Sequence, residues 1–160
     1  MTHKTFVIVR SILFLCCLFI FCGYAHAENK KLEYLKNNFN NVYMSNYDQF
    51  WKILHDAQKK AESCESAEDT IAFLKLVEIR TGNAEFNEYF NEVIEKLCIE
   101  KPKCFFDALA NLNENAIIRT VALLKAPLFV DTGDIDAVFK KNENVKKYAV
   151  IMSEYFSGKK

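Results

Sequence analysis

The sequence is poor in the residues on which most enzyme chemistry depends. The 160-residue chain has 4 glycines and 3 histidines, and beyond residue 27 only Gly82, Gly133, Gly158 and His55 remain. Glycine-rich loops that cradle phosphate are therefore missing, and so are the histidine pairs of the common zinc and di-iron sites. His55 lies beside an apolar helical stripe and is interpreted as a boundary residue. We expect no enzyme activity, no cofactor and no bound metal.

Arginine is also scarce, and the charges nearly cancel. Beyond residue 27 the arginines are Arg80 and Arg119. The chain has 21 basic and 21 acidic residues, so without Lys4 and Arg10 its formal charge is −2. Such a chain has no positive field for a phosphate backbone and few of the guanidinium groups that bind phosphate in a bidentate manner. Nucleic acid and anionic lipid are therefore not expected as partners.

The N-terminal segment, residues 1–27, has the layout of a cleavable secretory signal. A basic start precedes an apolar run over residues 11–23, and the small residues Ala25 and Ala27 follow. We expect cleavage before Glu28 and a secreted or periplasmic product. The style of the signal and the absence of an Asn-x-Ser/Thr sequon favour a bacterial periplasm or exterior.

Two other interpretations of this segment stay open. Residues 6–25 are long enough for an uncleaved membrane anchor, and Cys22 could be the lipidated residue of a lipoprotein. The polar residues from Glu28 onward favour cleavage over an anchor, and the bulky residues 19–21 fit a lipoprotein signal poorly.

Three cysteines remain after cleavage: Cys64, Cys98 and Cys104. In an oxidising compartment, three cysteines suggest one disulfide and one free thiol. We favour Cys98 with Cys104, because Pro102 separates two expected helices and brings the end of one close to the start of the next. Pairing of Cys64 with either of the others is the alternative.

Apolar residues recur at helical spacing beyond residue 28, and no segment alternates with the period of two that marks a strand. We therefore expect an all-α fold. It should be a compact bundle or a short HEAT-like stack of about seven to eight short antiparallel helices. Residues 28–160 should form a single domain, with a peripheral first helix over 28–44 and the core in 45–160. The expected helices cover about residues 32–42, 47–64, 71–79, 86–98, 104–112, 117–124, 132–141 and 145–156.

The helix that follows Asn83 is the most clearly amphipathic of the chain, and Asn83 is a candidate N-cap for it. Its polar face carries a row of acidic residues: Glu85, Glu88, Glu92 and Glu95. Such a row is ordinarily the solvent-facing side of a helix. The functional interpretation is an acidic ridge that attracts the basic surface of a partner protein.

Two aromatic residues are further candidates for partner binding. Phe105 and Phe106 are adjacent, and we expect that both cannot face inward from one helix, so Phe106 is a candidate exposed anchor. Trp51 is likewise adjacent to Phe50, so it is also a candidate exposed anchor. Exposed tryptophan and phenylalanine side chains are typical anchors of protein interfaces.

Taken together, the sequence favours an exported, non-enzymatic protein-binding module. An inhibitor or immunity-type partner of a secreted protein fits export, small size and segregated charge. The alternative is a small secreted carrier whose helices enclose an apolar ligand, which would use the many Phe and Tyr residues.

Overall fold

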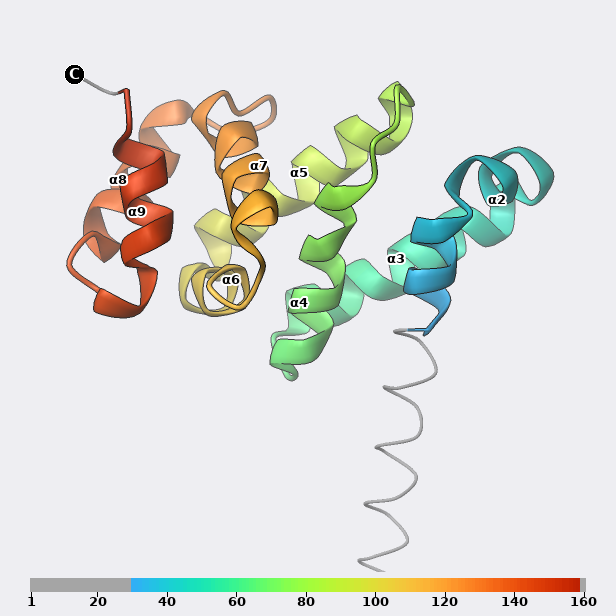
Figure 1. Ribbon diagram of the computed structural model, residues 1–160, viewed down its shortest axis with the longest axis horizontal. Coiled ribbons are helices and arrows are strands. Elements are labelled where there is room, and N and C mark those ends of the chain that lie inside the picture. Colours follow the sequence, from blue (N-terminus) through green and yellow to red (C-terminus); the bar gives the residue numbers. More distant parts are fainter. Residues whose placement is uncertain (1–29, 159–160) are drawn as a thin grey trace, which may run out of the picture.

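In the computed structural model, residues 30–158 are described, and all regular structure in this range is helical (Figure 1). The all-α prediction is confirmed, whereas the signal segment lies outside the described residues. None of the helices described combines the length and apolar character needed to cross a bilayer. After a helix over residues 30–37, the elements are α2 (Phe39–Ser45), α3 (Tyr47–Ser63), α4 (Ala67–Leu74), η1 (Lys75–Glu78), α5 (Ala84–Glu100), α6 (Pro102–Leu109), α7 (Glu114–Lys125), α8 (Thr132–Asn142), η2 (Lys146–Tyr148) and α9 (Ala149–Phe156).

The helices follow one another along the long axis of the molecule, from α2 at one end to α8 and α9 at the other (Figure 1). Each packs on near neighbours in the chain: α3 on α4, α4 on α6, and α7 on α9. The longer α5 contacts both α6 and α8. Packing therefore mostly joins helices that are close to each other in the chain.

Asparagine and aspartate side chains fix the starts of several helices, because they accept hydrogen bonds from backbone N–H groups that the first turn leaves without partners. Asn83 Oδ1 accepts from the N–H of Phe86 at 2.8 Å, which confirms the expected cap of α5. Asn113 caps α7 in the same way. The caps of this kind are Asn46, Asn83, Asn113 and Asp131.

The core begins in the first helices. Leu35 is fully buried, and the Phe39 ring lies 5.1 Å from Phe50 and 4.9 Å from Phe86, measured between ring centroids. The segment that we expected at the periphery therefore supplies side chains on which α3 and α5 pack.

Phe105 and Phe106 are both fully buried, so the expectation of an exposed Phe106 is wrong. The reason is that α6 is covered on two sides, by α4 and α5 and by the C-terminal elements. Phe106 lies 5.1 Å from Phe139 and 5.3 Å from Tyr148 between ring centroids. A helix enclosed in this way buries two adjacent positions, which the sequence pattern alone did not reveal.

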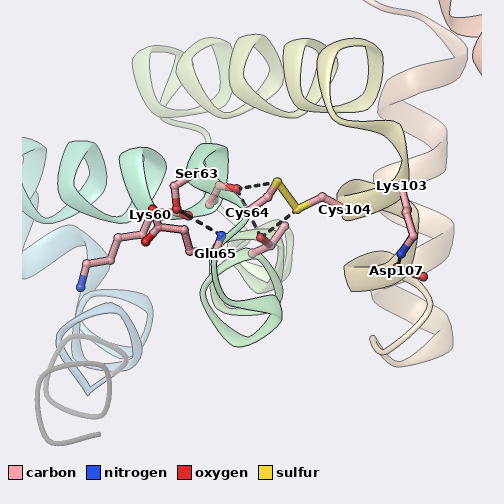
Figure 2. The surroundings of a disulfide bond; sticks show 9 residues. Lys60, Ser63, Cys64, Glu65, Lys103, Cys104 and Asp107 are labelled. Carbon is pink, nitrogen blue, oxygen red and sulfur yellow. Dashed lines mark hydrogen bonds and ion pairs between the residues drawn. A yellow bond between two sulfur atoms is a disulfide. The ribbon is translucent and has the colours of Figure 1, made fainter. Parts of the chain in front are cut away.

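The disulfide joins Cys64 to Cys104, not Cys98 to Cys104 (Figure 2). The favoured pairing is therefore wrong, and the alternative with Cys64 is confirmed. Because α4 packs on both α3 and α6, it brings the C-cap of α3 beside the first turn of α6, with the two Cα atoms 6.0 Å apart. Cys98 instead lies on the buried face of α5, where burial raises the pKa of its thiol to about 12.

Candidate functional site

Of the six candidate binding residues, the structure places two in one surface and two beside it, and it buries the other two. The surface lies where α3 and α5 run beside each other, and we call it the α3–α5 seam. Its members are Tyr43 from α2, Tyr47, Trp51, His55 and Gln58 from α3, and Glu85 and Tyr89 from α5. Glu88 and Glu92 flank it on α5, whereas Glu95 and Phe106 are buried elsewhere.

Regular helical spacing places these side chains. Tyr47, Trp51 and His55 are four residues apart on α3 and so share one face of that helix. Glu85 and Tyr89 have the same spacing on α5. Tyr47 contacts Glu85 near the start of both helices, and Trp51, His55 and Gln58 all contact Tyr89 one turn further along α5.

Glu85 lies at the N-terminal end of the seam and is held by two tyrosines. The hydroxyl of Tyr43 donates to Oε2 at 2.7 Å, and the hydroxyl of Tyr47 donates to Oε1 at 2.5 Å. Both hydrogen bonds, above all the one from Tyr47, lower the pKa of the Glu85 carboxyl group. The bond between Tyr47 and Glu85 also raises the pKa of the Tyr47 hydroxyl. Glu85 therefore stays ionised, and its negative charge lies among aromatic rings at an exposed position.

The centre of the seam is a group of three rings. The half-buried Trp51 ring lies 5.2 Å from Tyr89 and 5.8 Å from His55, between ring centroids. The Tyr89 hydroxyl donates to Oε1 of Gln58 at 2.8 Å, and burial is the main cause that raises the pKa of Tyr89. The Trp51 Nε1 atom is buried without an acceptor in hydrogen-bonding geometry among residues 30–158. The rings thus pack against one another, with His55 exposed and Trp51 and Tyr89 half-buried.

Carboxylates surround these rings. Glu88 is exposed beside the seam, and Glu92 forms an ion pair with Lys96 one turn further along α5, at 2.5 Å. The charges of Glu62 and Glu92 contribute to the raised pKa of Tyr89, which places both carboxylates near its hydroxyl. The seam therefore combines aromatic surface with negative charge.

Glu95 does not belong to the solvent-facing row, so this part of the prediction is wrong. Its side chain is fully buried, and its two oxygens accept the backbone N–H groups of Leu128 and Phe129, each at 2.8 Å. The connection between α7 and α8 passes over α5 at this point, and its backbone donors need acceptors. Only the packing of a distant loop distinguishes this glutamate from the others.

Several seam residues escaped the sequence analysis. Tyr43, Tyr47, Gln58 and Tyr89 are not among the residues that the sequence singled out. A usable signal was present, because Tyr47, Trp51 and His55 repeat at four-residue spacing along α3, next to the apolar stripe that includes Leu54 and Ala61.

Within residues 30–158, no group of His, Cys, Asp and Glu side chains is placed to hold a metal ion. The acidic side chains of the seam instead bind tyrosine hydroxyls or lysine.

Comparisons with known proteins add one sequence similarity. No family model matches the chain, and no solved structure matches it. Over 116 residues the chain is 30% identical to elongation factor P of Moorella thermoacetica, an alignment that covers 69% of this chain and 59% of that protein. The chain thus spans less than two thirds of this relative, and we argue function from the α3–α5 seam itself.

Proposed function

We propose that the protein is an exported, non-enzymatic protein-binding module, an inhibitor or immunity-type partner of a secreted protein, that docks through the α3–α5 seam. The observation that carries this proposal is the placement of Tyr47, Trp51, His55 and Tyr89 in mutual contact at the surface, with the ionised Glu85 beside them.

Tryptophan and tyrosine dominate the binding energy of protein interfaces because they bury a large area and lose little conformational freedom. In the seam this freedom is already restricted, since Trp51 contacts four other rings and Tyr89 is bonded to Gln58. A partner that covers these rings gains apolar burial at a small entropic cost.

The charge of the seam favours a basic partner. Glu85, Glu88 and Glu92 give this side of α5 a negative character, and Lys96 offsets only part of it. A basic protein surface fits this charge, and the attraction speeds association more than it tightens binding. Arginine suits the seam best, because its guanidinium stacks on aromatic rings and bonds to carboxylates.

The carrier of an apolar ligand is the weaker interpretation of the same aromatic content. A carrier needs an enclosed apolar cavity, yet rings fill the space between helices at the C-terminal end, where Phe139 and Tyr155 stack 3.6 Å apart between centroids. The aromatic surplus is thus used for packing there and for the seam at the other end.

The test is affinity capture from the periplasmic or secreted fraction of the source organism. The protein should recover a specific basic partner, and Trp51→Ala should weaken its binding by about thirtyfold or more, as expected for an interface anchor. Tyr34→Ala is the matched control, because Tyr34 is 56% exposed and lies outside the seam. Equal losses for the two variants, or recovery of no partner, would contradict the proposal.

Export has its own test. N-terminal sequencing of the native protein should begin at Glu28. A native chain that begins at Met1 in the cytosol would remove the exported part of the proposal and leave the seam to be tested separately.

A further inference from the structure

A groove with different chemistry lies on the opposite side of α5. It runs between η1, α5 and α7 and has a volume of about 470 Å³. Its apolar lining includes Val77, Phe90 and Leu123, and its polar lining consists of Asn87, Asn91 and Arg119. Because Asn87 and Asn91 are displaced by half a turn from Glu85 and Tyr89, the groove and the seam are separate surfaces.

Arg119 is the feature of this groove that the fold does not explain. Its side chain is half-buried, and within residues 30–158 no carboxylate pairs with it and no other acceptor binds its guanidinium. The guanidinium carries five N–H donors, and because it is half-buried beside apolar surface, a carboxylate bound there would interact with it more strongly than at a fully exposed position. The groove thus has one fixed positive charge and no internal counter-charge.

The rest of the lining suits a peptide. Asn87 Nδ2 donates to the backbone oxygen of Thr81 at 3.3 Å, which leaves the amide oxygen of Asn87 as an acceptor. On α7 the exposed Ile118 and Ala122 extend the apolar surface beside Arg119. Apolar side chains of a helix can lie in such a groove while an acidic residue of the same helix reaches the guanidinium.

We propose that the α5–α7 groove binds an apolar helical segment of a partner protein through a carboxylate that pairs with Arg119. A fatty acid also combines apolar surface with a carboxylate. However, the groove is open to solvent along its length, whereas sites for small ligands enclose most of the ligand surface. The side-chain amides of Asn87 and Asn91 further favour a peptide.

The experiment uses the protein as the cell makes it, labelled with ¹⁵N. Its probe is a synthetic amphipathic helix of about 14 residues built from leucine, alanine and glutamate. This peptide should shift the Nε–H resonance of Arg119 and leave that of Arg80 unchanged. The same peptide with glutamine in place of glutamate should bind at least about tenfold more weakly.

Two variants form a matched pair. Arg119→Gln should weaken binding of the glutamate peptide by at least about tenfold, whereas Arg80→Gln should leave it unchanged, since Arg80 does not line the groove. Trp51→Ala should also leave it unchanged, so failure of this proposal and failure of the seam proposal are distinguishable.

Three results would overturn the inference. The first is equal binding of the glutamate and glutamine peptides. The second is sodium palmitate binding that depends on Arg119 and is tighter than binding of the peptide, which would make the ligand a lipid. The third is a concentration-dependent dimer, detected by light scattering, that Ala122→Glu abolishes, because a second copy would then cover the groove.

Discussion

The two ends of the molecule use aromatic residues in different ways. In the α3–α5 seam the rings of Tyr47, Trp51 and Tyr89 contact one another while partly exposed. In the C-terminal half, the rings of Phe106 and Phe139 contact each other and are both fully buried. Ring contacts alone therefore do not distinguish a binding surface from a core, whereas exposure does.

The carboxylates that bind tyrosine hydroxyls show the same contrast. In the C-terminal half, Asp107 accepts from Tyr148 and also from Lys103 and Lys147, each at 2.8 Å, so its charge is compensated. Glu85 accepts only tyrosine hydroxyls among the contacts described, so its charge stays available to a partner. Two lysines thus neutralise the charge of Asp107, whereas no cation does so for Glu85 among the contacts described.

Among the variants proposed, Phe106→Ala should cause the largest loss of stability, because it removes a ring from the buried aromatic contacts of the C-terminal half. Removing a fully buried phenylalanine should lower the free energy of unfolding by about 4 kcal/mol. Trp51→Ala removes a half-buried ring and should lower it by about 2 kcal/mol or less. Urea unfolding followed by far-UV circular dichroism measures both. A larger loss for Trp51→Ala would show that the seam is part of the core.

The disulfide connects the end of α3, beyond the seam, to the half that contains Phe106 (Figure 2). It closes a loop between residues 40 positions apart in sequence, so Cys104→Ser should lower the free energy of unfolding by about 3 to 4 kcal/mol. Cys98→Ala is the control, with an expected loss of about 1 kcal/mol. If Cys98→Ala were the more damaging variant, the assigned pairing would be wrong.

Glu95→Ala should distinguish a structural glutamate from the glutamates of the proposed docking surface on the same helix. It leaves the backbone N–H groups of Leu128 and Phe129 without their acceptor, at an expected cost of about 2 to 3 kcal/mol in unfolding free energy. Glu88→Ala, at an exposed position, should change stability by less than about 0.5 kcal/mol. Thermal unfolding of the two variants checks this difference, and equal melting temperatures would contradict it.

Asp107→Asn should have the smallest effect, and that effect should depend on pH. Hydrogen bonds from Lys103 first, and then Lys147, lower the pKa of Asp107 well below its usual value. The ionised form therefore stabilises the fold above about pH 4, and this contribution is lost as the pH falls below that value. The variant should be less stable than the native protein by about 1 kcal/mol near pH 7, and the difference should shrink toward pH 2. A difference that grows on acidification would contradict the assigned network.

The sequence predicted the helical class and most helix positions, because apolar periodicity and capping residues such as Asn83 and Asn113 are local signals. It failed where packing between distant segments decides the outcome. In the sequence, Glu95 resembles the other glutamates of α5, and only the packing of the loop at Leu128 buries it. Cys98 is the nearer cysteine to Cys104 in sequence, but the packing of α4 places Cys64 beside Cys104. For the site, the sequence indicated Trp51 and the acidic row of α5 as candidate binding residues. Their meeting through Tyr47 and Tyr89 depends on how α3 and α5 pack.

Site-specific photo-crosslinking in the source organism tests the central claim most directly, which is that the seam is the docking surface. A photoreactive residue at His55 should give a covalent adduct with one partner protein, and the adduct should disappear when Trp51 is also changed to alanine. The same probe at Ala137, an exposed position on α8, should give no such adduct. An equal adduct from Ala137, or none from His55 while Ala137 reacts, would show that the protein binds through its other end.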